Sequence, residues 1–343
     1  MIAAFFLTLL PVSCSWNEEQ KDPEFSNTPH GNFMALWTIM DERYCFFDLK
    51  KEMLGVDWNE VRTRYAASIT DGMSDKALFE VLCNMIGELR DGHVNLTSSY
   101  DYGRNWSWKT DYPANFSKDI RDRYLGNDYI IGGNGYYYRI LEDNIGYLVV
   151  ESFESSISSG RINVMFNNMA LCNGLIIDIR DNGGGDLTAA EFLASHFTER
   201  TVTTGYSCYK TGPGHNDFSV FYSNELSPAR EDLRWIKPVV LLTNRGCFSS
   251  ANDFAFTMKA LDNVTLLGDT TGGGGGMPMS SELPKGWVVR FSSAPVFDAD
   301  TCHVEFGVAP HIRVDMKDEE MMSGKDTYIE EARKFINDKL VNP

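Results

Sequence analysis

The N-terminal part of the chain shows the hydrophobic spacing of amphipathic helices. Apolar side chains in "FMALWTIMDERYCFF" recur at steps of three and four residues: Phe33, Leu36, Trp37, Met40 and Tyr44. The segment "SDKALFEVLCNMIGEL" has the same spacing: Ala77, Leu78, Val81, Leu82 and Met85. Asp57, before "WNEVRTRYA", and Ser74 stand where helix N-caps are expected. The pattern predicts a small helical domain over residues 29–95.

Further along, short apolar runs alternate with amphipathic segments. The runs "IGYLVVESF", "GLIIDIR", "PVVLLTN" and "VTLLGD" are almost continuously apolar, as strands buried on both faces are. Helical patterns such as "DLTAAEFLASHF" lie between them, which predicts an α/β core over residues 141–343. Two more strands and a final helix, "DTYIEEARKFINDKL", complete this core. Residues 96–140 are rich in Tyr, Asn, Asp and Trp and predict connecting loops and short strands.

A third pattern precedes the helices. An apolar run from Ile2 to Val12 is too short to span a bilayer and fits the apolar part of a secretory signal. It ends in "PVSC", which resembles a bacterial lipoprotein signal in which Cys14 is lipidated. We therefore expect a signal over residues 1–14, a polar tether over 15–28, and export to the periplasm or outer membrane with attachment only through the lipid. Plain secretion and an apolar cytoplasmic N-terminus are the alternatives.

Charge and cysteine usage exclude several classes of function. The 343 residues include 31 basic and 48 acidic side chains, a net charge of −17, and no basic run, which argues against nucleic-acid binding. The six cysteines beyond Cys14 have no CxxC spacing, so no zinc or dithiol redox site is predicted. No membrane-spanning segment is expected.

Two adjacent serines, Ser249 and Ser250, follow a buried strand and precede an amphipathic helix. Serine is a favoured N-cap, so this is one interpretation. The other is a nucleophile, because side chains at a strand-to-helix turn project over the strand ends, where open α/β sheets bind ligands. The local pattern by itself favours capping.

Two glycine-rich turns and the histidines supply the other candidate groups. The turn "RDNGGGD" after a buried strand lets backbone N–H groups approach a ligand closely. Neither this turn nor "GDTTGGGGG" is followed by the lysine of a phosphate-binding P-loop. Of the six histidines, His93 is best placed as a base, since Gly92 is expected to end the helix before it. His303 and His311 are the other candidates.

Four segments in this order resemble the serine peptidases of the C-terminal-processing and tricorn-core family. They are a helical region ending in "DGH", the strand and triple glycine "GLIIDIRDNGGG", the segment "VVLLTNRGCFSSANDFA", and the closing motifs "LLGDTTGGGGG" and "EFGVAPHIRV". Together they cover residues 30–316. The resemblance implies a helical bundle packed on a crotonase/ClpP-like α/β core with short additional strands.

The resemblance also implies roles for individual residues in acyl transfer. Ser250, before Ala251 and three residues before Asp253, matches the nucleophile, with Ser249 left to cap the helix. His93 matches the base and Glu305 the acidic member of the tricorn-like branch, although Glu305 lies one residue closer to Gly307 than the family pattern has it. We expect an oxyanion hole built from backbone N–H groups, those of Gly183, Gly184 and Ala251. No metal or cofactor is required.

Two departures from the family pattern bear on the function. The lysine base of the bacterial branch is replaced by glycine within residues 272–276. About 45 residues separate Val94 from the strand at Ile145, too few for the PDZ domain that many members carry there. The prediction is a serine endopeptidase acting on peptides or proteins. A ligand- or peptide-binding protein without catalysis on the same scaffold, and an unrelated α/β hydrolase or nucleotide binder, are the alternatives.

Overall fold

A computed structural model describes residues 25–230 and 232–341. The expected signal, Cys14 and most of the tether lie outside these residues. In the described ranges, no helix is long and apolar enough to cross a membrane.

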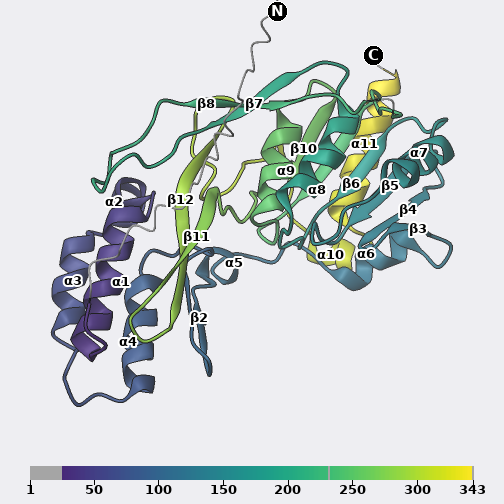
Figure 1. The fold of residues 1–343 in the computed structure, drawn as a ribbon. Coiled ribbons are helices and arrows are strands. Elements are labelled where there is room, and N and C mark those ends of the chain that lie inside the picture. Colours follow the sequence, from purple (N-terminus) through teal and green to yellow (C-terminus); the bar gives the residue numbers. More distant parts are fainter. Residues whose placement is uncertain (1–24, 231, 342–343) are drawn as a thin grey trace, which may run out of the picture.

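The larger of two sheets forms the expected α/β core (Figure 1). Its strands, in spatial order, are β13 (Ile312–Arg313), β10 (Val264–Gly268), β9 (Val239–Thr243), β6 (Leu175–Asp178), β5 (Gly146–Val150), β4 (Tyr136–Ile140) and β3 (Ile130–Gly133). The five strands from β13 to β5 pair in parallel, and β4 and β3 continue the sheet antiparallel. The prediction of an α/β core with buried strands is confirmed.

Helices cover both faces of this sheet, which explains the continuous apolar runs. One face packs against α7 (Ser159–Asn168), α8 (Leu187–Ala194), which continues into a 3₁₀ turn at Ser195–Phe197, and α9 (Ser250–Lys259). The other face packs against α6 (Lys118–Leu125) and α11 (Thr327–Val341). Along β9, Val239 and Leu241 belong to the first core while Val240 and Leu242 belong to the second. Each strand therefore needs apolar side chains at every position.

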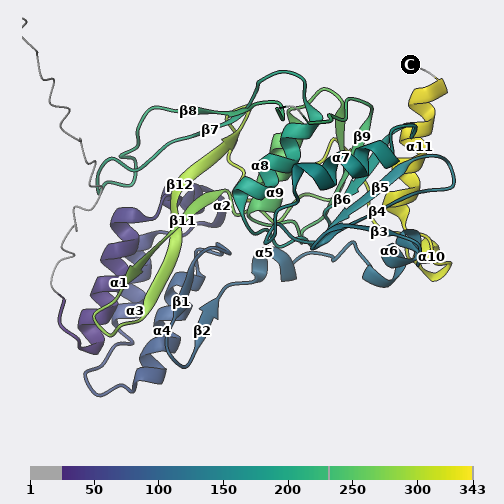
Figure 2. The same ribbon diagram turned by 45° about the vertical axis from the view of Figure 1, so that its right-hand side comes forward.

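The second sheet joins distant parts of the chain. Its strands are β2 (Tyr102–Arg104), β1 (Asn95–Thr97), β12 (Val288–Asp298), β7 (Val202–Ser207) and β8 (Tyr222–Leu226), with β11 (Gly276–Glu282) paired to β12. Figures 1 and 2 both show the long strand β12 running between the N-terminal helices and the α/β core. This sheet therefore connects the two predicted regions.

The predicted helical region consists of α1 (Pro29–Arg43), α2 (Phe47–Leu54), α3 (Trp58–Ala66) and α4 (Asp75–Gly87). Its hydrophobic core also contains side chains from the β11–β12 hairpin: Leu283, Trp287, Val289 and Phe291. Asp57 and Ser74 are N-caps as predicted, accepting hydrogen bonds from Glu60 N–H and Ala77 N–H respectively. Gly92 does not end a helix, because α4 already stops at Gly87.

The region predicted as loops and short strands also holds two helices, α6 and the single-turn α5 (Ser107–Thr110). The short helix α10 (Asp318–Met322) precedes α11.

No disulfide links the cysteines of the described ranges, all of which are free thiols.

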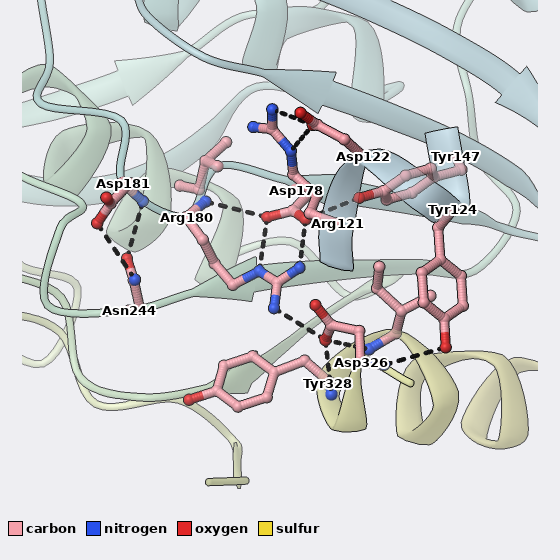
Figure 3. Close-up of polar contacts among 12 residues, drawn as sticks. Arg121, Asp122, Tyr124, Tyr147, Asp178, Arg180, Asp181, Asn244, Asp326 and Tyr328 are labelled. Carbon is pink, nitrogen blue, oxygen red and sulfur yellow. Dashed lines mark hydrogen bonds and ion pairs between the residues drawn. The ribbon is translucent and has the colours of Figure 1, made fainter. Parts of the chain in front are cut away.

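A buried ion-pair network links Arg180, which precedes the triple-glycine loop, to the start of the C-terminal helix (Figure 3). Arg180, two residues beyond the end of β6, donates from Nε to Asp178 at 2.8 Å and from Nη1 to Asp326 at 2.9 Å. Asp326 also accepts the N–H of Tyr328 at the start of α11. Burial raises the pKa of Asp178, but the Arg180 guanidinium outweighs this and holds the pKa below its usual range. These buried bonds hold Arg180 in place at the start of the triple-glycine loop.

Candidate active site

Ser249 has a strained backbone that points its side chain out of the strand-to-helix turn. Its φ is 56° and its ψ is −124°, a conformation that residues with a Cβ rarely adopt. The turn is held by two backbone bonds, from Ser249 N–H to the Gly273 carbonyl at 2.9 Å and from Phe248 N–H to the Asn182 carbonyl at 3.1 Å. Such strain costs about 1–3 kcal/mol and is concentrated at functional sites.

The strained conformation places Ser249 against His93. The Ser249 Oγ lies 3.0 Å from His93 Nε2, within hydrogen-bonding distance. Ser249 is the N-cap residue of α9, as expected, but its side chain makes no capping bond to the first turn. The positive φ turns the hydroxyl away from those N–H groups and into the cleft.

Ser250 occupies a different position from the one expected. It is the first residue of α9 and only 2% exposed, and its Oγ has no hydrogen-bond partner among the described residues. The expected pairing of His93 with Ser250 is therefore wrong: the pairing is with Ser249. The sequence shows two neighbouring serines before a helix and contains no local signal for which of them takes the positive φ.

His93 is a buried, neutral imidazole. It is 3% exposed, and its ring makes a T-shaped contact with the Phe248 ring at a centroid distance of 4.9 Å. Burial lowers the pKa of His93 to about 4, Arg290 and Arg104 act in the same direction, and Asp91 opposes them. The imidazole is therefore free to accept a proton at neutral pH.

Asp91 holds the backbone around His93 and was missed by sequence reasoning. Its Oδ1 accepts the His93 backbone N–H at 2.7 Å. Its Oδ2 accepts the hydroxyls of Tyr44 at 3.1 Å and Ser292 at 2.9 Å. The "DGH" segment contains this aspartate, and its position two residues before His93 was the available signal.

Glu305 lies in the same interior but is bound by other partners. Its Oε1 accepts from Lys50 Nζ at 2.7 Å and its Oε2 from Gly275 N–H at 3.1 Å. No hydrogen bond joins it to His93 in the described ranges. Burial raises the pKa of Glu305 to about 7, Asp91 adds to this, and Lys50 opposes it. Lys50 itself is fully buried on α2 and could not be singled out from the sequence.

The expected oxyanion donors are only partly available. Gly184 N–H donates to Asn182 Oδ1 at 2.9 Å, and Ala251 N–H donates to the Phe248 carbonyl at 3.1 Å. These two N–H groups are engaged, so the expectation for Gly184 and Ala251 is wrong. In the described part of the chain, no hydrogen-bond acceptor is found for the N–H of Gly183 or Ser250.

The triple-glycine loop passes directly over the start of α9. At Gly184, where φ is 101°, an added Cβ would lie 2.7 Å from the Phe248 carbonyl oxygen and 3.1 Å from Ser250 N. Only glycine permits this approach, because the conformation and the lack of space both exclude a side chain. The approach brings the loop's backbone close to Ser249 and Ser250.

A cleft of about 170 Å³ contains the paired serine and histidine. Its walls include the second glycine run, Gly274, Gly275 and Gly276, and also Ser250 and Arg290. No group of histidine, cysteine or carboxylate side chains suited to a metal ion occurs in the described ranges. The arrangement is suited to nucleophilic attack by a hydroxyl with a neutral imidazole as base.

The other two candidate histidines, His303 and His311, lie outside the cleft. His303 packs on the Phe297 ring at a centroid distance of 4.4 Å. His311 accepts the backbone N–H of Leu266 through Nδ1 at 3.0 Å. Neither lines the cleft with Ser249.

Comparison with known families and proteins identifies peptidase relatives of this chain. The model of peptidase family S41 matches residues 144–314, and that of the tricorn protease C1 domain matches residues 25–87. The carboxy-terminal processing protease CtpA of Bacillus subtilis is 26% identical over 184 residues, which are 53% of this chain and 37% of that protein. This chain thus spans little more than a third of the length of that curated relative.

Two solved structures extend the comparison over nearly the whole chain. A candidate peptidase from Parabacteroides merdae is 47% identical, with a TM-score of 0.86 over 91% of this chain and 97% of that one. Mature CPAF in complex with lactacystin is 12% identical, with a TM-score of 0.72 over 92% and 99% of the two chains. The second likeness is one of fold alone.

Proposed function

This chain belongs to peptidase family S41 and is therefore a serine-type peptidase, and we propose that it hydrolyses peptide bonds with Ser249 as nucleophile and His93 as general base. The single observation that carries the assignment is the 3.0 Å contact between Ser249 Oγ and His93 Nε2. The strained backbone at Ser249 supports it, because a hydroxyl raised on a sharp strand-to-helix turn is the arrangement of a nucleophile elbow.

The chemistry follows from this contact. His93 takes the proton of Ser249 as the hydroxyl oxygen bonds to the peptide carbonyl carbon. The imidazolium then gives that proton to the leaving amine while the carbon–nitrogen bond breaks, and an acyl-enzyme remains. A water molecule, deprotonated by His93, attacks this ester, and Ser249 leaves with the proton restored.

We place the oxyanion hole at the N–H groups of Ser250 and Gly183. Ser250 N–H follows the nucleophile directly at the start of α9, where the helix dipole also favours negative charge. Gly183 lies beside Gly184, which contacts this helix start. Loss of one such donor costs about 10²–10³ in rate.

Two carboxylates support the base in this proposal, and neither contacts the imidazole nitrogens. Asp91 favours the imidazolium by its charge and holds the His93 backbone. Glu305 holds the N–H of Gly275, whose neighbour Gly276 lies in the cleft wall beside His93. The acidic role that the family resemblance implies for Glu305 is thus an indirect one, through the glycine run.

Substrates are proposed to be peptides or proteins, and no preference for C-termini follows. The segment between Val94 and β5 is occupied by short strands and helices, so a PDZ domain is not inserted there.

We also propose export, with lipidation at Cys14, supported by the apolar run that precedes this cysteine.

A fluorophosphonate probe tests the nucleophile. We expect the wild-type protein to be labelled on Ser249, as read by peptide mass spectrometry, and the Ser249→Ala variant to be unlabelled. The neighbouring Ser250→Ala variant is the matched control and should keep its label. Labelling that persists in Ser249→Ala and disappears in Ser250→Ala would show that the assignment of the two serines is reversed. No labelling of the wild type, while a known serine peptidase is labelled, would reject the proposed activity.

A further inference from the structure

A second, larger cavity adjoins the catalytic cleft. Its volume is about 760 Å³, and its walls come from α8, α9, β7, β8, β11 and β12. Four residues line both spaces: Leu187, Asp253, Met277 and Val296. The larger cavity therefore lies directly beside the cleft that contains Ser249 and His93.

The cavity has the charge of a cation site. Three carboxylates line it, those of Glu191, Glu225 and Asp253, while lysine, arginine and histidine are absent from its lining residues in the described part of the chain. The walls between them are partly aromatic, with Phe254 and Phe256 on α9. An aliphatic stem that ends in a positive charge matches both features, since lysine and arginine bury their methylene groups along apolar surface.

Asp253 lacks a partner in the structure. Its carboxylate accepts no hydrogen bond and forms no ion pair with any described residue, while its backbone N–H donates to the Ser249 carbonyl at 2.9 Å. The unpaired group is therefore fixed one helical turn from the nucleophile. Burial raises the pKa of Asp253 to about 7, and the nearby charge of Glu191 adds to this. A cation placed between the two carboxylates would relieve that repulsion.

We propose that this cavity is a specificity subsite that binds a lysine or arginine side chain of the substrate, next to the peptide bond that Ser249 attacks. The proposal rests on the proposed peptidase function and adds a substrate class to it. Asp253 contacts the cation nearest the scissile bond, and Glu191 and Glu225 extend the negative surface further from it.

The test measures kcat/KM for peptides that differ at one position. The peptides carry lysine, arginine, norleucine or glutamate at that position. Mass spectrometry of the products identifies the peptide bond that is cut. We expect the basic peptides to exceed the norleucine peptide by tenfold or more, as sites built around a polar substrate group discriminate strongly. The preference should shrink when salt is raised, because the carboxylates are partly exposed.

Variants separate the cavity from the catalytic centre. Glu191→Gln and Asp253→Asn should each lower the ratio of basic to norleucine kcat/KM severalfold. Glu191 lines the larger cavity and not the catalytic cleft, so labelling of Glu191→Gln by the fluorophosphonate shows whether the nucleophile is intact. The matched control is Glu199→Gln, which removes the same charge from an exposed residue outside this cavity and should leave the ratio unchanged.

The outcomes distinguish the two proposals. Cleavage without preference for basic residues, or a preference that survives in the double variant Glu191→Gln/Asp253→Asn, would overturn the subsite and leave the peptidase function standing. Absence of both labelling and cleavage of every peptide would overturn the peptidase function, and the subsite with it.

Discussion

Lys50→Met is the substitution whose consequences the structure specifies most closely. Lys50 and Glu305 form a buried ion pair with a 2.7 Å contact, and their side chains are 0% and 3% exposed. Methionine has a similar length and no charge, so the change removes the cation while keeping most of the packing. Glu305 then loses its closest positive charge but keeps its hydrogen bond from Gly275 N–H.

The magnitude follows from the pKa of Glu305. Burial raises it from 4.5 to about 7 even with Lys50 present. Ionising Glu305 in the folded protein therefore costs about 3 kcal/mol more than in the unfolded chain. For a carboxyl with a raised pKa, the folded state binds the proton more tightly, so stability falls as pH rises from about 4.5 to about 7 and is then constant.

Without Lys50 the pKa of Glu305 rises above 7, and the loss of stability continues to higher pH. Relative to wild type, Lys50→Met should become progressively more destabilised above pH 7, by up to about 1.4 kcal/mol for each pH unit. Near pH 5, where Glu305 is protonated in both proteins, the difference reduces to packing and to the burial of the lysine charge.

Urea unfolding of wild type and variant at pH 5, 6, 7, 8 and 9 measures this difference. Lys51→Met is the matched control, because Lys51 is the next residue on α2 and pairs with Asp57 at the surface. That change should have little effect on the free energy of unfolding at any pH, because exposed ion pairs contribute weakly. Equal destabilisation by Lys50→Met at pH 5 and pH 9 would refute the reasoning. It would also be refuted if Glu305→Gln left the pH dependence of the free energy of unfolding unchanged.

Three further predictions concern other parts of the site. The acid limb of the pH profile of kcat/KM should lie near pH 4 rather than 6.5, because burial lowers the pKa of His93. Asp91→Asn should move this limb to still lower pH, because it removes a charge that favours imidazolium. An acid limb at pH 6.5 in the wild-type profile would contradict this prediction. Gly184→Ala should reduce kcat about 10²-fold in a peptide hydrolysis assay, because the added Cβ displaces the loop from the start of α9. Gly183→Ala is the control: its Cβ has open space around it, so its kcat should stay within severalfold of the wild-type value. Arg180→Met should lower the free energy of unfolding by about 3–5 kcal/mol, because it leaves buried carboxylates unpaired; a loss no larger than that of Arg200→Met, which breaks an exposed pair, would count against it.

The elements of the fold were largely predictable from local pattern. Helix caps at Asp57 and Ser74 depend only on side chains within three residues, so they could be recognised directly. The continuous apolar runs of β6 and β9 indicated burial on both faces, because alternate residues of a strand point to opposite sides. The order of the motifs was enough to indicate the family.

The site was predictable only in part. His93 could be chosen because it follows the helical region in a recognisable segment. Which of Ser249 and Ser250 meets His93 could not be predicted, because it depends on a backbone conformation that is stabilised by bonds to Gly273 and Asn182 from other loops. The helix pattern that begins after these serines is equally consistent with either of them as nucleophile.

What the sequence determined by itself was therefore periodicity: which segments are helices and strands, which of their faces are buried, and in which order the motifs occur. The tertiary structure decided which groups meet. His93 and Ser249 are 156 positions apart, and Lys50 and Glu305 are 255 apart. Periodicity arises from the local geometry of the backbone, whereas such contacts form only when distant loops pack together, and their distances and pKa values depend on that packing.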